Sequence, residues 1–330
     1  MSSFKTKTQL LVLSTASKRL FKIVHYICQV SSPESPKQKA YIYMHISILL
    51  WGLTGVLGRG IQLSEGLLVW YRMLLTVGSM LVFILYRRRS LIIPLADMPR
   101  LFAIGTLLTV HWLFFYGSIK YSTVSITLCM LATSAIFTAL FEPLLTPKKF
   151  EWQEVIFGTL ALVGIWLIFA AEQVYTTGII LGLLASFVGS FFNIFNKDMV
   201  QRHSAVIVSF YEIAAGVVML TLFLPFYIGY FHPVKLLPSS TDWLLLLILA
   251  IACTHVTLVL SLAALRHLSA FTLNLSINLE PIYGITLAFL IFHENDHLHR
   301  GFFVGAGVIM LSVMLHAIFQ HRATTIATVE

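Results

Sequence analysis

Ten long apolar stretches follow one another along most of this chain, and short polar segments separate them. A helix rises about 1.5 Å per residue and the hydrocarbon core of a bilayer is about 30 Å thick, so roughly 20 apolar residues cross it. Each stretch is close to that length and apolar on all sides, which predicts membrane-spanning helices rather than the alternating strands of a barrel. The predicted spans are residues 42–60, 65–86, 100–119, 124–145, 153–171, 177–196, 204–230, 243–264, 270–292 and 301–319.

The composition excludes a water-soluble domain. Hydrophobic residues make up 58% of the chain and charged residues only 11%, which leaves too little polar surface for an aqueous globule. The longest segments between predicted spans, 87–99 and 231–242, are too short to fold into a catalytic or nucleotide-binding domain. We therefore expect an all-α integral membrane protein whose function lies inside the bilayer.

The basic residues predict the orientation. With the N-terminus in the cytosol, the cytosolic side carries Arg87, Arg88, Arg89, Arg100, Lys148, Lys149, Lys197, Arg202, Arg266 and Arg322, and the outer side carries Arg59, Lys120, Lys235 and Arg300. This asymmetry follows the positive-inside rule, so we expect a multi-pass protein of the cell (inner or plasma) membrane with both termini cytosolic. The net charge of +8 has the same explanation, and no nucleic-acid partner is expected.

The basic N-terminal tail, residues 1–40, has two interpretations. Apolar residues between 10 and 27 fall near helical spacing with basic residues between them, which favours a helix lying on the inner leaflet. An unstructured leader, or a start codon assigned too early, explains the segment equally well. Residues 321–330 form the expected C-terminal tail.

No cofactor or metal is expected. Three cysteines, Cys28, Cys129 and Cys253, are too far apart in sequence for a metal clip or a disulfide framework. His293, His297 and His299 resemble zinc ligands, but they share one short loop without a second ligand cluster.

The chain also repeats itself. Tyr71-Arg72 matches Tyr211-Glu212, the run from Gly52 to Arg59 aligns with Ser190 to Lys197, and Thr123 to Gly158 parallels Ser269 to Gly305. Two halves of five spans result, residues 41–172 and 173–320. Because five is odd, the second half must enter the bilayer from the opposite face, so we expect ten transmembrane helices as two inverted-topology repeats.

Several of these residues resemble a known family. Leu50-Trp51-Gly52, Arg72, Glu280-Pro281 and the glycines of the fifth and tenth spans are similar to the EamA-type branch of the drug/metabolite transporter superfamily, over nearly everything after residue 40. The resemblance implies a ten-helix carrier with a central cavity, commonly an exporter of amino acids or related metabolites. In the fourth span, where this family often has proline, the position matching Pro281 is Ala135, preceded by Ser134, so the sequence does not support a symmetrical kink in the first half.

Arg72 lies inside the second predicted span. A charged residue at membrane depth costs about 2.5–3.5 kcal/mol on insertion scales and usually faces a cavity or a partner. A guanidinium group can hold a carboxylate or phosphate through two parallel hydrogen bonds. We expect Arg72 to anchor an anionic substrate group; a permanent ion pair or a helix-capping contact is the alternative.

Glu212 occupies the equivalent place in the second half with the opposite charge. A direct bridge to Arg72 is one interpretation, but the inverted symmetry places the two residues at different depths, which favours two levels of one polar cavity. An acid at that depth could exchange a proton in step with the substrate, so protons are the candidate coupling ion.

Glu280 lies near the middle of the ninth span, directly before Pro281. Proline removes a backbone donor and frees the carbonyl group of Ile277, which predicts a bent helix beside a cavity. Asn274 and Asn278, four residues apart, share one helical face. We expect these residues to contact substrate; the alternative is a protonated Glu280 that hydrogen-bonds between helices.

Histidine and aromatic residues are weaker candidates. His111 and His255 lie in the middle of their spans, where they contact either substrate or a packing partner. Stacking on a substrate is the functional interpretation for the aromatic residues, although bilayer interfaces and cores collect aromatic residues in any case. These residues are Trp51, Tyr71, Tyr116 and Tyr211.

The expected function is secondary-active export of small metabolites, such as amino acids or derivatives, by alternating access of the two halves. Membrane lipids and protons are the other expected partners. The alternative is an intramembrane enzyme or scaffold acting on lipid-linked substrates, although the sequence has no paired catalytic carboxylates, no HExxH helix and no nucleophile with a base. The sequence leaves the substrate, the direction and the oligomeric state open, a homodimer included.

Overall fold

The computed structural model describes residues 36–145, 152–265, 267 and 279–327. The chain divides into two units, residues 1–39 and 40–330. Of the first unit only residues 36–39 are described, and all the other described residues belong to the second. The amphipathic helix expected between residues 10 and 27 lies outside the described residues, as do Asn274, Asn278 and the carbonyl group of Ile277.

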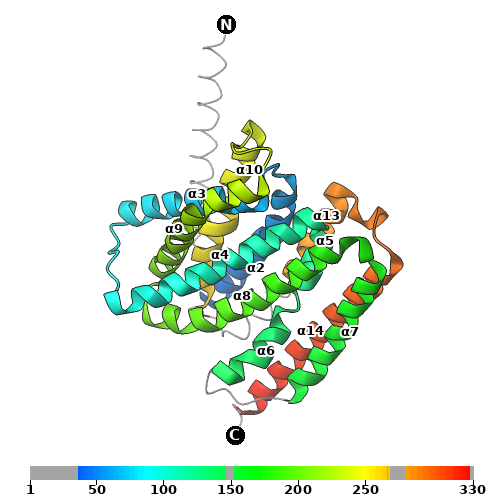
Figure 1. The fold of residues 1–330 in the computed structure, drawn as a ribbon. Helices are drawn as coiled ribbons and strands as arrows, with labels where there is room; N and C mark the ends of the chain where they lie inside the picture. Colours follow the sequence, from blue (N-terminus) through cyan, green and yellow to red (C-terminus); the bar gives the residue numbers. More distant parts are fainter. Residues whose placement is uncertain (1–35, 146–151, 266, 268–278, 328–330) are drawn as a thin grey trace. The chain divides into compact units, whose positions relative to one another are not determined.

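The described residues are helical, with short turns between the helices and no strand (Figure 1). The α-helices are α2 (Pro36–Gly60), α3 (Glu65–Tyr86), α4 (Met98–Tyr121), α5 (Val124–Leu131), α6 (Ser134–Leu145), α7 (Trp152–Ala171), α8 (Thr176–Arg202), α9 (Ala205–Phe231), α10 (Ser240–Ala250), α11 (Thr257–Leu265), α13 (Glu280–Phe292) and α14 (Arg300–Ala327). Short 3₁₀ turns η1 (Leu95–Asp97), η2 (Gln173–Tyr175) and η4 (Glu294–Asp296) precede α4, α8 and α14, and a π-helical segment, η3 (Ile251–Val256), joins α10 to α11.

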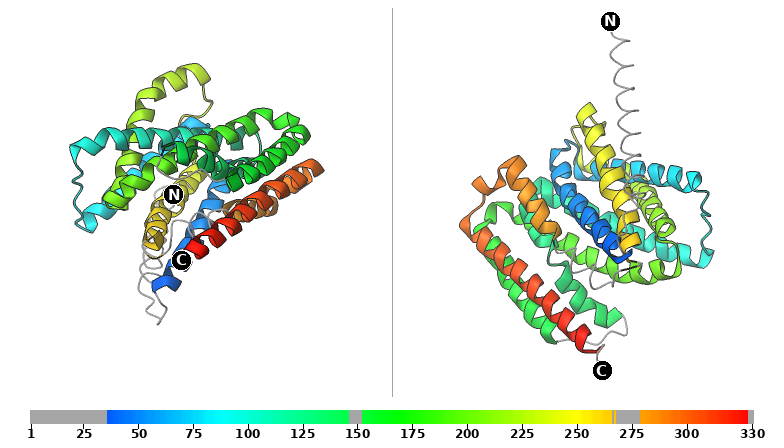
Figure 2. Two further views of the ribbon diagram at one scale, coloured as in Figure 1. Left: turned by 90° about the horizontal axis from the view of Figure 1, so that it is seen from below. Right: turned by 180° about the vertical axis from the view of Figure 1, so that it is seen from behind.

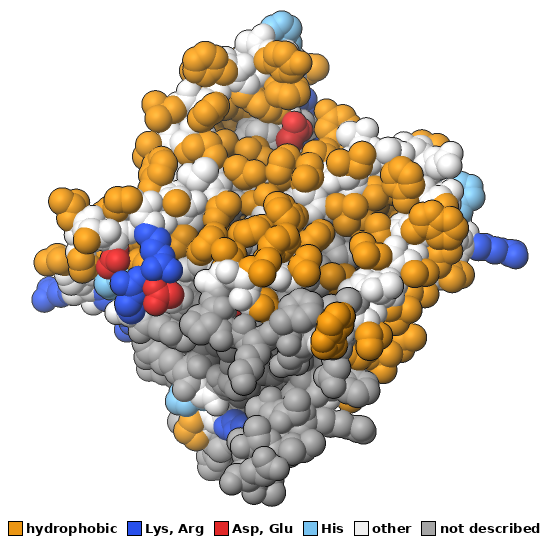
Figure 3. All heavy atoms as spheres, turned by 60° about the horizontal axis from the view of Figure 1, so that its bottom comes forward, with side chains coloured by type: hydrophobic (Ala, Val, Ile, Leu, Met, Phe, Trp, Pro, Cys, Tyr) orange, Lys and Arg blue, Asp and Glu red, His pale blue; other side chains and the backbone are white. Residues whose placement is uncertain are grey.

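Seven helical segments of the described chain are long and apolar enough to cross a membrane by length and composition. They coincide with seven of the predicted spans. The other three predicted spans contain shorter apolar helices, Ile156–Ala171, Glu280–Phe292 and Arg300–Ser312. Large apolar side chains lie on the surface, including Val82 at 69%, Trp166 at 65% and Phe226 at 77% exposure. Figure 3 shows such side chains spread over one face, and a surface of this kind fits lipid rather than water.

The helices approach closely where glycine replaces a side chain. α7 lies along α14, as both views of Figure 2 show. A Cβ atom added to Gly164 would lie 2.8 Å from the carbonyl oxygen of Gly305, and one added to Gly305 would lie 2.6 Å from that of Gly164. Gly52 of α2 meets Gly284 of α13 in the same way, with 3.0 Å between an added Cβ and the Gly284 nitrogen. The glycines therefore permit the close helix packing that membrane bundles use.

The fourth predicted span is broken at Ala132–Thr133, away from Pro143, which lies inside α6. α5 ends at Leu131 and α6 begins at Ser134. The hydroxyl group of Thr133 donates to the carbonyl oxygen of Met130 at 2.6 Å and lies 3.0 Å from the Ser186 hydroxyl of α8. These hydroxyl groups, one of them from a neighbouring helix, supply polar partners at the break. The fourth span therefore breaks at a place where the sequence offered no proline as support for a kink.

Candidate functional site

Arg72 lies on the buried face of α3, with 3% of its surface exposed. Its Nε and Nη2 atoms donate to the hydroxyl oxygen of Thr254 at 3.1 and 2.9 Å, and Nη1 donates to that of Tyr116 at 2.7 Å. The Trp112 ring covers the guanidinium group, with 3.8 Å between Cζ and the ring centroid. Two neutral hydroxyl groups and an aromatic face therefore hold this cation.

No carboxylate of the described residues contacts Arg72. A guanidinium group has five N–H donors, and these hydrogen bonds engage three of them. One N–H on each terminal nitrogen is left without an acceptor among the described residues. Glu280 is near enough for its charge to interact with that of Arg72, without an ion pair between them. The alternative of a permanent ion pair is absent from this part of the chain.

Thr254, which the sequence analysis missed, is presented by the π-helical segment η3. Its hydroxyl group donates to the carbonyl oxygen of Leu249, five residues earlier, at 2.8 Å while accepting both bonds from Arg72. Trp51 bonds the residue that follows this segment, because its indole N–H donates at 3.0 Å to the hydroxyl oxygen of Thr257, the first residue of α11. π-helical turns are frequent at functional sites, but the apolar run 243–264 gives no sign of one.

Glu280 is the first residue of α13, and Pro281 lies in its first turn. A proline in the first turn replaces an N–H that would have no helical partner. The residues before Leu279, on which the predicted proline bend depends, lie outside the described residues. The backbone of Glu280 lies against α2, with 3.3 Å between its oxygen and a Cβ placed on Gly52.

Glu212 of α9 is 1% exposed and lies apart from Arg72. The amide Nδ2 of Asn196, on α8, donates to its Oε2 at 3.2 Å. Two acceptor atoms of this pair, Glu212 Oε1 and Asn196 Oδ1, are buried without a hydrogen-bond partner in the described structure. A direct bridge between Arg72 and Glu212 is therefore absent.

The two histidines have packing partners. His111 donates through Nδ1 to the carbonyl oxygen of Ala185 at 2.7 Å. His255 Nδ1 lies 3.1 Å from the Ser79 hydroxyl, and its ring meets Phe83 edge-on. Both histidines therefore contact neighbouring helices, which fits their interpretation as packing residues rather than as substrate contacts.

The predicted aromatic residues separate into two groups. Tyr116 is fully buried and bonded to Arg72, and Trp51 bonds Thr257, the first residue after the segment that carries Thr254. Tyr71 and Tyr211 instead anchor loops: the Tyr71 hydroxyl donates to the carbonyl oxygen of Leu236 at 3.2 Å, and that of Tyr211 to Leu91 at 2.7 Å. Each of these tyrosines holds the segment between the second and third spans of the other half.

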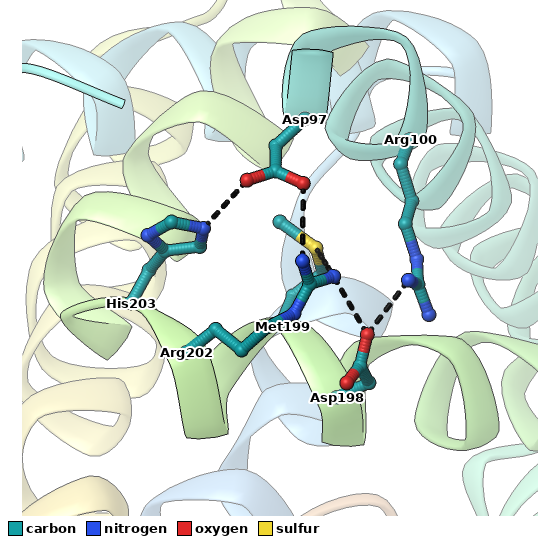
Figure 4. Close-up of polar contacts among 6 residues, drawn as sticks. All are labelled: Asp97, Arg100, Asp198, Met199, Arg202 and His203. Atoms are coloured by element: carbon teal, nitrogen blue, oxygen red, sulfur yellow. Dashed lines mark hydrogen bonds and ion pairs between the residues drawn. The ribbon is translucent and has the colours of Figure 1, made fainter. Parts of the chain in front are cut away.

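At the C-terminal end of α3, charged side chains connect α4 to α8 (Figure 4). Asp97 accepts from Arg202 at 3.3 Å and pairs with His203 at 2.8 Å, while Asp198 pairs with Arg100 and Arg202, each at 2.7 Å. Arg100, Asp198 and Arg202 are 41–49% exposed, so these are surface ion pairs of small net strength.

At the N-terminal end of α3 the connections are buried. Asp242, at the start of α10, accepts from the backbone of Gln62 at 2.8 Å. Glu294 accepts from the first backbone N–H groups of α5, those of Val124 and Ser125, at 3.0 and 2.9 Å. A surface pocket of about 420 Å³ lies at this end, with Gln62 among its lining residues, and none of the predicted site residues lines it.

The histidine loop does not form a metal cluster. His299 contacts Glu172, with its backbone N–H 2.7 Å from that carboxylate, and no group of three or more His, Cys, Asp or Glu residues in the described chain could hold a metal ion. The carboxylate of Glu172 thus joins the end of α7 to the start of α14.

Comparison with known proteins adds independent information. A model of the EamA-like transporter family matches the chain twice, over residues 38–170 and 176–318. A protein of Archaeoglobus fulgidus named as an uncharacterized transporter is 22% identical over 301 residues, which cover 86% of this chain and 99% of its own. A protein of known crystal structure superposes with a TM-score of 0.59 at 16% identity, over 86% of this chain and 98% of that one, a likeness of fold alone.

Proposed function

Because this chain belongs to the EamA-like transporter family, we propose that it is a secondary-active transporter that exports small metabolites, such as amino acids or their derivatives. Membership of the family and the seven apolar helices make the chain a multi-pass membrane transporter, and they indicate transport rather than enzymatic catalysis. The substrate class, the direction and the mechanism are the proposal.

The proposed architecture is ten transmembrane helices in two inverted five-helix repeats. Two matched contacts support it. Tyr71 bonds the segment before α10 and Tyr211 bonds the segment before α4, so equivalent residues make reciprocal contacts between the halves. Asp97 and Asp242 make a second pair of reciprocal contacts. Asp97, before α4, binds Arg202 and His203 at the end of α8, and Asp242, before the third predicted span of the second half, binds the backbone of Gln62 just after α2. Reciprocal contacts of this kind suit alternating access, in which one set opens while the other stays closed.

The observation that carries the substrate proposal is the state of Arg72. Among the described residues, this buried cation leaves two N–H groups unused and contacts no carboxylate, which favours an anion that enters from outside the protein. Glu280, the first residue of α13, is the acid that we assign to the same site. A zwitterion fits such a pair, with its carboxylate on Arg72 and its ammonium group near Glu280.

Metabolite profiling of cells with and without the protein tests this function. The flux into proteoliposomes is then measured for each compound whose level differs between the two kinds of cell. We expect amino acids or related zwitterions to accumulate inside cells that lack the protein, and their flux to respond to an imposed pH gradient. Flux of none of the changed compounds would contradict transport, and flux that ignores the pH gradient would contradict proton coupling.

The proposed location is the cell membrane, with both termini in the cytosol. This places the Asp97 ion pairs on the cytosolic side and the Asp242 and Glu294 contacts on the outer side. Labelling of single cysteines introduced at exposed positions Arg88 and Val234 by an impermeant reagent tests the orientation. We expect label from outside intact cells at position 234 and not at position 88.

A further inference from the structure

The contact between Glu212 and Asn196 is incomplete in a specific way. One hydrogen bond joins them, from Asn196 Nδ2 to Glu212 Oε2 at 3.2 Å. The remaining oxygen of each side chain, Glu212 Oε1 and Asn196 Oδ1, is buried and has no donor in the described structure. The only other buried side-chain polar atom of the described chain with no partner is the Ser64 hydroxyl oxygen.

An ionised Glu212 does not fit this environment. A buried acceptor without a donor destabilises the folded state, and a buried carboxylate without a counter-charge destabilises it further. The amide of Asn196 can satisfy one carboxylate oxygen only. Its own carbonyl oxygen is a second acceptor beside a carboxylate, so both oxygens need a donor.

The charged and titratable groups on the helices packed against α9 do not supply that donor. Arg72 is bonded to Thr254 and Tyr116, His111 to the backbone of Ala185, and His255 to Ser79. The other groups are engaged at the helix ends, and the side chain of Lys197 lies outside the description. Those groups are Glu65 with Tyr227, Lys120 with the backbone of Ile61, Arg100 with Asp198, and Arg202 with Asp97 and Asp198.

A single proton satisfies both oxygens. When Glu212 Oε1 binds H⁺, the carboxylate becomes a neutral carboxylic acid, and its new O–H can donate to Asn196 Oδ1. The amide N–H continues to donate to Oε2. The two side chains then form a ring closed by two hydrogen bonds, the pairing that a carboxylic acid and a primary amide make.

We propose that Glu212 and Asn196 form an acid–amide pair that binds one proton between α8 and α9, and that this structure is the proton-loaded form. Release of the proton leaves an uncompensated carboxylate, which is stable only when water or a substrate cation reaches it. Opening of the contact between the two helices therefore accompanies proton release. The existence of the acid–amide pair is inferred from the Glu212–Asn196 geometry. Its role in transport rests on the proposed proton coupling.

Infrared spectroscopy of the full chain in nanodiscs tests the pair without any transport measurement. We expect a carbonyl band of a protonated carboxylic acid at neutral pH that Glu212→Gln removes. The glutamine amide can make the same two hydrogen bonds with Asn196, so this variant should fold. Asn196→Leu should shift the band to higher frequency, because the Glu212 carbonyl loses its donor. Asn295→Leu, which removes an exposed loop amide paired with Asp296, is the matched control and should leave the band in place.

Two results overturn the pair: a wild-type spectrum whose protonated-acid band survives Glu212→Gln, or a Glu212 band that does not move in Asn196→Leu. Should Glu212→Gln fail to insert, Glu212→Asp provides the same test, since its shorter side chain loses Asn196 and its band must shift.

Flux in proteoliposomes separates the pair from its role. We expect Glu212→Gln to abolish acceleration by a pH gradient while substrate exchange at equal pH continues. If the infrared bands behave as expected and the wild-type flux ignores the gradient, proton coupling is overturned and the acid–amide pair stands.

Discussion

Arg72 and Glu212 occupy equivalent positions of the two halves, yet their surroundings differ in kind. Three hydrogen bonds and an aromatic ring hold Arg72, all from neutral groups. One amide holds Glu212, and in the described structure one oxygen of each of these two side chains lacks a donor. Because arginine keeps its proton in proteins whereas a carboxylate can gain one, the first site is suited to attract an anion and the second to take up a proton. The repeat thus places two different chemistries at one architectural position.

One difference between the two halves, glycine in the first and asparagine in the second, accompanies the different partners of Arg72 and Glu212. In the alignment of Gly52–Arg59 with Ser190–Lys197, Gly58 matches Asn196. A Cβ atom on Gly58 would lie 2.3 Å from the Tyr116 ring, so the glycine leaves room for the tyrosine that binds Arg72. In the second half, the equivalent position itself supplies the partner of Glu212.

The largest expected effect comes from Arg72→Lys. Lysine keeps the charge but loses the planar fork, so two charge-assisted hydrogen bonds to substrate are replaced by one point contact. At about 1.5–3 kcal/mol for a hydrogen bond to a charged group, we expect about 100-fold weaker substrate binding. The Michaelis constant for flux in proteoliposomes measures it, and an unchanged constant would rule out bidentate anchoring.

Tyr116→Phe should have the next largest effect. It removes the acceptor of Arg72 Nη1 and lets the guanidinium group shift, for which we expect about tenfold weaker binding. Tyr121→Phe, on the same helix with 52% of its surface exposed, is the matched control and should bind substrate like the wild type. Equal effects of the two changes would show that the Tyr116 hydroxyl does not position Arg72.

Gly58→Ala tests the room left for Tyr116. The added methyl group must displace the ring, and overpacking of this kind costs about 1–3 kcal/mol. We expect a lower midpoint of thermal unfolding together with weaker binding. Gly78→Ala, with nothing within 4 Å of an added Cβ, is the control and should be neutral or stabilising. A stable, fully active Gly58→Ala variant would separate Gly58 from the Arg72 site.

The smallest effects are expected for Tyr71→Phe and Tyr211→Phe. Each removes one neutral hydrogen bond to a loop carbonyl group, for which we expect about 0.5–1.5 kcal/mol of lost stability and unchanged substrate binding. Similar decreases in the midpoint of thermal unfolding would show that the two tyrosines have the same role in their halves. The difference between the halves would then lie in the adjacent residues, Arg72 and Glu212. A loss of binding in one of them would place that tyrosine in the transport site.

Part of this arrangement could be predicted from the sequence. The spans, Arg72 and Glu212 follow from apolar run lengths and from charges inside them, because both are local properties of the chain. Thr254 and Asn196 could not be found this way. A threonine or asparagine in an apolar run is ordinary by itself, and their importance depends on which helix packs beside them.

The sequence by itself determined that this chain is helical, membrane-embedded and internally duplicated, because bilayer thickness and the cost of buried charge act on each segment separately. Only the tertiary structure decided that hydroxyl groups and an aromatic ring surround Arg72, that the fourth span breaks at Ala132–Thr133, and that Glu212 meets an amide. Those outcomes depend on contacts between residues far apart in the chain, such as the 182 positions that separate Arg72 from Thr254.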